Sequence, residues 1–202
     1  MSVAGPLEWS ATVRPAPGET LSGDAFVVEA FEGGALAAAI DGLGHGAPAA
    51  LAAERAVATL REAPGAAPAD LLQRCHAALA RTRGAVVSLA AFDAAAGSMT
   101  WTGVGNVQAE LFRLDPKARP TREALLLRGG VVGDRLPSLR VSALSVFPGD
   151  VLVLATDGID RAFSSSIVVT DPVERIAASV LHDFGSAKDD ALVVVARWRG
   201  AA

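Results

Sequence analysis

The segment Asp24–Gly46, DAFVVEAFEGGALAAAIDGLGHG, decides how this chain folds. Its two apolar runs, Asp24–Phe31 and Ala35–Asp41, predict strands, and the Glu-Gly-Gly sequence between them predicts a tight turn. In a hairpin, the start of the first strand lies beside the end of the second. We therefore expect the carboxylates of Asp24 and Asp41 to meet at one edge of a sheet.

The rest of the chain is rich in short strands. Apolar runs predict eight more of them, at Trp9–Arg14, Ala85–Phe92, Met99–Gly103, Val107–Leu114, Ala124–Leu127, Leu139–Val146, Val151–Thr156 and Ala191–Trp198. Helices are expected at Pro48–Glu62, Ala69–Thr82 and Pro172–His182, the last capped by Thr170-Asp171. Strands joined only by turns pair antiparallel. Two packed sheets with helices on their outer faces would bury the apolar faces, which predicts one α+β domain over residues 1–202.

Composition narrows the class of protein. The chain has 202 residues, a net charge of −4 and no run of basic residues, which argues against nucleic acid as a partner. Cys75 is its only cysteine, as is typical of a reducing compartment. The sequence begins without a signal-peptide pattern and has no apolar run of about 18 residues. We expect a soluble cytoplasmic protein that binds neither nucleic acid nor membrane.

A second set of aspartates also lies at the ends of predicted strands. Asp157 closes the predicted strand in VLVLATDG, and Asp189 and Asp190 open the strand in DDALVVVARW. If these two strands are antiparallel neighbours, Asp157 and Asp189 converge as well. The two pairs would then face one another across a sandwich of sheets.

Carboxylates gathered in this way predict a metal site. They repel one another and resist ionisation unless a cation is present, and their hard oxygen atoms suit Mg²⁺ or Mn²⁺. Two such ions can hold a hydroxide and a phosphate together, which is the positioning and charge neutralisation that phosphoryl transfer needs. Each aspartate taken alone is more often an ordinary turn or cap residue than a metal ligand.

The glycine-rich sequence after Asp41 is a candidate part of this site. Gly42, Gly44 and Gly46 allow the backbone to approach a ligand closely, so the Gly42 carbonyl can reach a metal. His45 is either a proton donor to a leaving alkoxide or a loop residue that faces solvent. The Gly103-Val104-Gly105-Asn106 sequence predicts a tight turn or bulge between two strands.

Five motifs in order now resemble the metal-dependent type 2C (PPM) protein phosphatases, and most closely their SpoIIE branch. They are Ser22-Gly23-Asp24, Asp41-Gly42-Leu43-Gly44-His45-Gly46, Gly103-Val104-Gly105-Asn106, Thr156-Asp157-Gly158 and Asp189-Asp190. The resemblance extends from about Trp9 to Trp198. It implies a four-layer αββα sandwich and a protein serine/threonine phosphatase with two Mn²⁺ or Mg²⁺ ions between its sheets.

The same resemblance implies roles for single residues. Asp41 bridges both metals and the Gly42 carbonyl binds one of them, while Asp24 serves the second metal. Asp157 and Asp189 serve the first, and Asp190 supports the ligands from behind. Water activated by the metals attacks phosphorus directly, without a phospho-enzyme.

The chain departs from many eukaryotic relatives at two points. Their phosphate-holding arginine lies shortly before the first acidic motif, whereas Arg14 lies ten residues before Asp24. Their histidine directly follows the Asp-Gly pair, whereas Leu43 stands there and His45 follows two residues later. The short chain resembles the stand-alone RsbX-type phosphatases of the bacterial stressosome, which implies a phosphorylated STAS-domain scaffold protein as substrate.

Two other functions are compatible with parts of the sequence. The glycines from Gly42 to Gly46 match the G-x-G-x-x-G/A pattern of nucleotide-binding proteins. A Rossmann unit would next need a strand ending in an acidic residue about 20 residues on, where a second helix is predicted instead. The other alternative is a PPM-fold domain that binds a partner without catalysis, although such a domain has no need for mutually repelling acids.

Overall fold

The computed structural model describes residues 2–200. Its strands are β1 (Ser2–Ala4), β2 (Leu7–Arg14), β3 (Asp24–Phe31), β4 (Gly34–Gly42), β5 (Ala85–Asp93), β6 (Ser98–Val104), β7 (Gln108–Phe112), β8 (Arg122–Ala124), β9 (Ser142–Ser145), β10 (Val151–Ala155) and β11 (Ala191–Trp198). Its helices are α1 (Ala47–Glu62), α2 (Pro68–Leu79), α3 (Val173–Phe184) and a short 3-10 helix at Arg161–Ser165.

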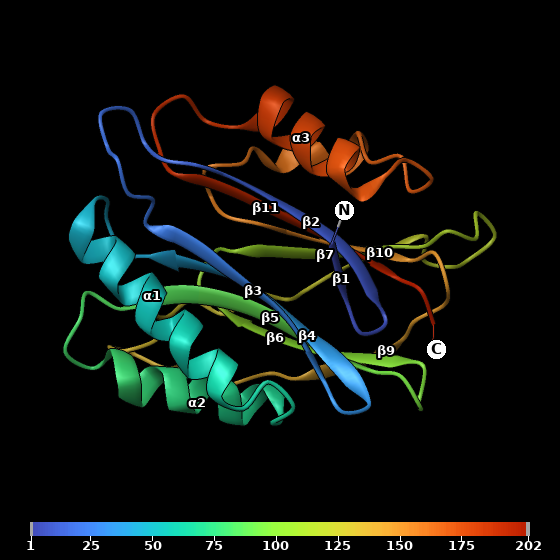
Figure 1. Cartoon of the computed structure of the whole chain (residues 1–202), viewed down its shortest axis with the longest axis horizontal. Coiled ribbons are helices and arrows are strands. Elements are labelled where there is room, and N and C mark those ends of the chain that lie inside the picture. The colour runs from blue at the N-terminus through green and yellow to red at the C-terminus, as the bar shows by residue number, and fades with distance from the viewer. Residues whose placement is uncertain (1, 201–202) are drawn as a thin grey trace.

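The strands form two antiparallel sheets that pack face to face (Figure 1). The six-stranded sheet has the order β1-β2-β11-β10-β7-β8, and the five-stranded sheet has the order β3-β4-β5-β6-β9. Helices α1 and α2 cover the outer face of the five-stranded sheet, and α3 covers the outer face of the other (Figure 1). The predicted αββα sandwich is therefore confirmed.

Strand β11 shows how a two-residue period places each side chain. Leu192, Val194 and Ala196 belong to the core between the two sheets, whereas Val193 and Val195 pack on the side of α3. Successive side chains of a strand point to opposite faces, and β11 is a central strand whose two faces are both covered. Its nearly unbroken apolar sequence follows from this position.

Small side chains bring α1 close to the five-stranded sheet. Its buried face carries Ala49, Ala52, Ala53 and Ala56, with Leu60 one turn further on. This helical spacing creates one apolar face, and alanine keeps the helix axis near the backbone of the sheet.

Most strand and helix predictions hold with shifted ends, but the predicted strand Ala124–Leu127 is wrong, because β8 ends at Ala124 and residues 125–127 are irregular. Other features differ as well. Strand β1 and the 3-10 helix were not predicted; β1 has only three residues, two of them exposed. Thr170-Asp171 does not cap α3, because the helix begins after Pro172 and has no side-chain cap. Finally, β4 pairs antiparallel with both β3 and β5, and α1 leads into α2, which excludes the Rossmann architecture.

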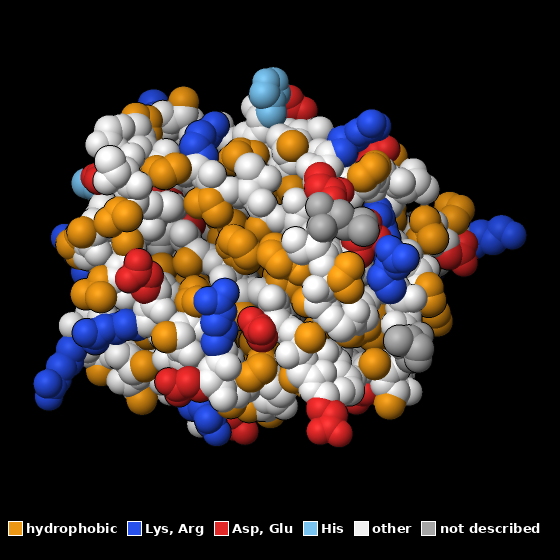
Figure 2. Space-filling model, in the orientation of Figure 1, with side chains coloured by type: hydrophobic (Ala, Val, Ile, Leu, Met, Phe, Trp, Pro, Cys, Tyr) orange, Lys and Arg blue, Asp and Glu red, His pale blue; other side chains and the backbone are white. Residues whose placement is uncertain are grey.

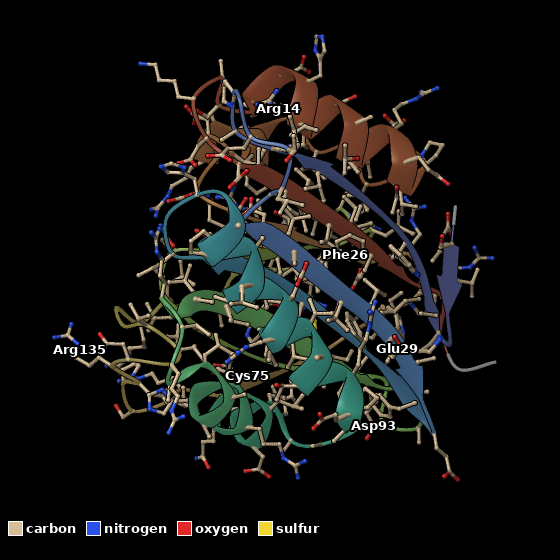
Figure 3. The ribbon with its side chains drawn as sticks, turned by 60° about the vertical axis from the view of Figure 1, so that its left-hand side comes forward. Arg14, Phe26, Glu29, Cys75, Asp93 and Arg135 are labelled. Atoms are coloured by element: carbon tan, nitrogen blue, oxygen red, sulfur yellow. The ribbon has the colours of Figure 1, made fainter. Side chains whose placement is uncertain are left out.

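One face of the molecule leaves part of the inter-sheet layer open. Figure 2 shows hydrophobic side chains gathered across the middle of this face, with charged side chains mostly around them. Phe26 lies between the two sheets there (Figure 3) and contacts Trp9 edge to face, with ring centres 5.7 Å apart. Among residues 2–200, no helix is long and apolar enough to cross a membrane.

Trp198 offers a direct test of the inter-sheet core. Its ring is 2% exposed and stacks on Phe92 of the opposite sheet, with ring centres 5.5 Å apart. We expect Trp198→Ala to lower the free energy of unfolding by about 3–5 kcal/mol, measured by urea denaturation. The control Phe147→Ala removes a ring that is 62% exposed and should change it by about 0.5 kcal/mol or less. Equal losses for the two variants would contradict this description of the core.

Candidate functional site

The four predicted strand-end aspartates come together at one end of the sandwich. Asp24 lies directly opposite Asp41 in the β3–β4 register. Strands β10 and β11 pair antiparallel up to Ala155 and Val193, so Asp157 and Asp189 follow and precede the paired region at the same edge. The predicted convergence of both carboxylate pairs is thus confirmed.

These carboxylates share one cavity of about 560 Å³. Asp190 joins them, and no lysine or arginine is among the lining residues. The remaining wall consists of Leu43, Gly44, His45, Val86, Gly105, Asn106, Gly129, Gly130 and Val131. The cavity is therefore strongly acidic on one side and built largely from glycine-rich loops on the other.

Asp24 is buried and Asp41 is half-buried, and both have a raised pKa. Burial raises the pKa of Asp41 to about 8, and the nearby charges of Asp24, Asp157 and the other acids add to the rise. Burial also raises the pKa of Asp24 to about 7. Without a cation, Asp41 is mostly protonated and Asp24 partly protonated near neutral pH, because a buried carboxylate among like charges is unfavourable.

A hydroxyl group ties Asp24 to the opposite sheet. Thr156, just after β10, donates a hydrogen bond of 2.6 Å from Oγ1 to Oδ2 of Asp24. The same Oγ1 accepts a hydrogen bond of 2.9 Å from the backbone N–H of Leu192 in β11. The hydrogen bond from Thr156 to Asp24 favours the ionised form of Asp24 and so opposes part of the rise in its pKa.

Asn106 positions Asp157, a role that the sequence did not reveal. Its Nδ2 donates a hydrogen bond of 2.8 Å to Oδ2 of Asp157. The preceding residue, Gly105, has φ +100°, and a β-carbon there would lie 2.1 Å from Cγ1 of Val86. The predicted turn is present, and its glycine lets the chain pass close to β5 and turn the Asn106 amide toward the carboxylate.

Both carboxylate oxygens of Asp190 accept hydrogen bonds from backbone N–H groups. Oδ1 accepts a hydrogen bond of 2.8 Å from the N–H of Ala16, and Oδ2 accepts one of 2.9 Å from the N–H of Gly23. These bonds hold the segment that precedes β3 against the start of β11. The geometry suits a residue that fixes the position of Asp24 from behind.

Gly42, at the end of β4, and Gly44, in the loop after it, are glycine for different structural reasons. A β-carbon on Gly42 would lie 2.2 Å from the carbonyl oxygen of Ala49 in α1, so helix contact alone requires glycine there. Gly44 has φ +90°, which favours glycine directly. His45 is exposed, and its Nδ1 lies 2.8 Å from Oε1 of Glu19; it lines the cavity, and both of its predicted roles stay open.

Arg14 is not placed to bind a ligand in this cavity. It lies near α3 (Figure 3), and its guanidinium donates a hydrogen bond to the carbonyl oxygen of Ser186. Its side chain is not part of the cavity wall. The sequence did not favour Arg14 as the residue that holds the phosphate, and its position outside the cavity wall agrees with that interpretation.

The donor set suits hard divalent cations. Carboxylates are ligands that Mg²⁺ and Mn²⁺ prefer, and a cation would offset the burial and the like charges that raise the pKa of Asp24 and Asp41. Gly42, whose carbonyl is the other predicted ligand, is not among the residues that line the cavity. Among residues 2–200, no three acidic, His or Cys side chains are already arranged to hold an ion. The acids thus line the cavity without forming a finished coordination shell.

Comparison with known proteins identifies relatives over nearly the whole chain. The family model described as Stage II sporulation protein E (SpoIIE) matches residues 32–199. None of the curated protein sequences matches closely enough to count as a relative.

Several solved structures have the same fold. One chain, from work described as "The bacterial stressosome: a modular system that has been adapted to control secondary messenger signaling", is 30% identical with a TM-score of 0.85, covering 95% of this chain and 99% of that one. RsbX in complex with magnesium is 19% identical with a TM-score of 0.82, covering 95% of both chains. The PP2C phosphatase domain of Bacillus subtilis SpoIIE, with a fragment of its regulatory domain, is 21% identical with a TM-score of 0.78, covering 97% of this chain and 64% of that one.

The pKa values of Asp24 and Asp41 predict an unusual pH dependence of stability. Carboxyls in an unfolded chain titrate near about 4, whereas these two titrate at about 7 and about 8 in the folded state. Between those values the folded state binds protons that the unfolded state has lost, so stability falls as pH rises. In chelator, the free energy of unfolding should fall between about pH 4 and pH 8.

The variant Asp41→Asn should reduce this fall and should be more stable than wild type at pH 8 in chelator, measured by urea denaturation. Asp93 lies at the opposite end of β5 from the cavity-lining Val86 (Figure 3), so Asp93→Asn should keep the wild-type pH dependence. If Asp41→Asn and wild type show the same pH dependence, the carboxylates do not repel one another as described.

Proposed function

This chain belongs to the SpoIIE family of PP2C-like (PPM) phosphatases, and on that basis we propose that it is a metal-dependent protein serine/threonine phosphatase. The proposed reaction is hydrolysis of phosphoserine or phosphothreonine by water. The observation that carries the proposal is the convergence of Asp24, Asp41, Asp157 and Asp189 on one cavity. Residues 1–202 act as a single catalytic domain in this proposal.

We propose two divalent cations, Mn²⁺ or Mg²⁺, as cofactors. Asp41, which lies opposite Asp24 and lines the cavity, would contact both, with the Gly42 carbonyl on one. Asp24 would hold the second cation, and Asp157 and Asp189 the first. When bound, the cations supply positive charge for the phosphate and activate water.

The chain's own residues keep these ligands in place. Thr156 holds Asp24, Asn106 holds Asp157, and Asp190 fixes the segment before β3. Phosphoryl transfer depends mainly on positioning and on charge stabilisation, so such supports contribute to the rate although they do not touch the substrate. His45, on the cavity wall, is the candidate to protonate the leaving alkoxide.

A bacterial regulatory protein is the substrate we propose, and within that class a STAS-domain scaffold of the stressosome type. The support is similarity: a chain from work on the bacterial stressosome is 30% identical over nearly the full length. A substrate of this kind would make the protein cytoplasmic, and we include that location in the proposal.

The proposal is tested by hydrolysis of a phosphoserine peptide and of an aryl phosphate, each with Mn²⁺, with Mg²⁺ and with chelator. Wild type should turn over with metal and stop in chelator. Asp157→Asn should lose at least about a hundredfold in kcat/KM, since a charged group at the reacting centre is removed. Asp93→Asn, which removes an equal charge far from the cavity, should keep wild-type activity.

Circular dichroism should show that Asp157→Asn is folded. Full turnover by this variant would contradict the site assignment. If wild type is inactive with each metal on both small substrates, a phosphorylated STAS-domain protein is the deciding substrate. Inactivity there as well would favour a binding domain over an enzyme.

A further inference from the structure

The cavity poses an electrostatic problem for a phosphate ester. Five aspartates line it, and its wall contains no lysine or arginine. Two divalent cations neutralise much of this charge, but a phosphoryl group carries oxygen atoms that need further hydrogen-bond donors. A cationic side chain at the rim is therefore worth seeking, particularly because Arg14 is bonded elsewhere.

Arg83 lies at this rim. It belongs to the turn between α2 and β5, and its guanidinium lies over Gly44, which is part of the cavity wall. A β-carbon on Gly44 would be 2.5 Å from Nη1 of Arg83 and 3.7 Å from Cζ. Glycine at this position leaves room for the guanidinium.

The turn that carries Arg83 is fixed against two walls of the cavity. The N–H of Leu43 donates a hydrogen bond of 3.0 Å to the carbonyl oxygen of Gly84. On the other side, a β-carbon on Gly84 would lie 2.6 Å from Cγ1 of Val131. Leu43 and Val131 both line the cavity, so Arg83 starts from a backbone that is packed between them.

A local hydrogen bond shapes the same turn. The N–H of Gly84 donates to Oγ1 of Thr82 at 3.0 Å, and that Oγ1 donates to the carbonyl oxygen of Leu79 at 2.8 Å. Gly84 itself has φ +80°. The backbone on both sides of Arg83 is therefore held.

The Arg83 guanidinium is free to take a ligand. Its side chain is exposed, and within residues 2–200 it makes no ion pair or hydrogen bond. Arg113, by contrast, is paired with both Glu123 and Asp150, and Arg135 projects away from the body of the molecule (Figure 3).

We propose that Arg83 binds the phosphoryl group of the substrate at the rim of the cavity. This inference rests on the proposed function. A guanidinium offers parallel N–H donors in a planar fork that matches two phosphate oxygens. Arg83 then binds the oxygens that face the rim while the aspartates hold the cations behind them.

The test is binding of inorganic phosphate to the Mg²⁺-loaded protein, measured by calorimetry. Arg83→Gln should weaken phosphate binding by about tenfold to a hundredfold, the usual effect of losing a charge-assisted hydrogen bond. Arg83→Lys keeps the charge without the fork and should give an intermediate value. Arg74→Gln, which removes an exposed arginine of α2, should bind phosphate as wild type does.

Two further readouts separate this role from a structural one. Mg²⁺ affinity should be the same in wild type and Arg83→Gln, because Arg83 is no metal ligand. In hydrolysis of a phosphoserine peptide, inorganic phosphate should inhibit Arg83→Gln more weakly than it inhibits wild type, by the same factor as the loss in binding.

Unchanged phosphate affinity in Arg83→Gln would overturn the proposal, as would an absence of phosphate binding by the wild type. A loss in Arg128→Gln but not in Arg83→Gln would also overturn it, since Nε of Arg128 is buried without a partner near the same loops. Phosphate binding does not require turnover. An inactive wild-type protein that binds phosphate through Arg83 would therefore contradict the proposed reaction and leave this assignment standing.

Discussion

Mutual repulsion among carboxylates held at one end of a sandwich is the constraint on which the rest of this structure depends. The β3–β4 register places Asp24 opposite Asp41, and the β10–β11 pairing brings Asp157 and Asp189 to the same cavity. Once the hydrophobic layer between the sheets is packed, these groups cannot separate. Protonation or a cation must relieve the repulsion, and at neutral pH a divalent cation does so more completely.

The surrounding structure keeps the acids from moving apart. Thr156 ties Asp24 to the opposite sheet, Asn106 holds Asp157, and Asp190 fixes the segment before β3 through two backbone N–H groups. Each bond links elements that are distant in the sequence. Holding these acids together lowers the stability of the folded chain and gives a preorganised anionic site, an arrangement that is common at functional sites.

Much of this arrangement could be predicted from the sequence because it follows from strand periodicity. A hairpin with a Glu-Gly-Gly turn fixes the meeting of Asp24 with Asp41, and short, nearly continuous apolar runs mark the strands. Asn106 could not be assigned its role, because an amide in a glycine turn has the same pattern whether or not it bonds a carboxylate. The position of Arg83 could not be predicted either, because only tertiary packing brings the turn after α2 beside Gly44.

Anomalous diffraction at the manganese edge from Mn²⁺-soaked crystals would show whether these aspartates form the proposed two-cation site. We expect two peaks in the cavity, about 3.5–4 Å apart, with one lying between Asp24 and Asp41 and the other between Asp41 and Asp157. Peaks only at surface carboxylates, or none in the cavity, would contradict it.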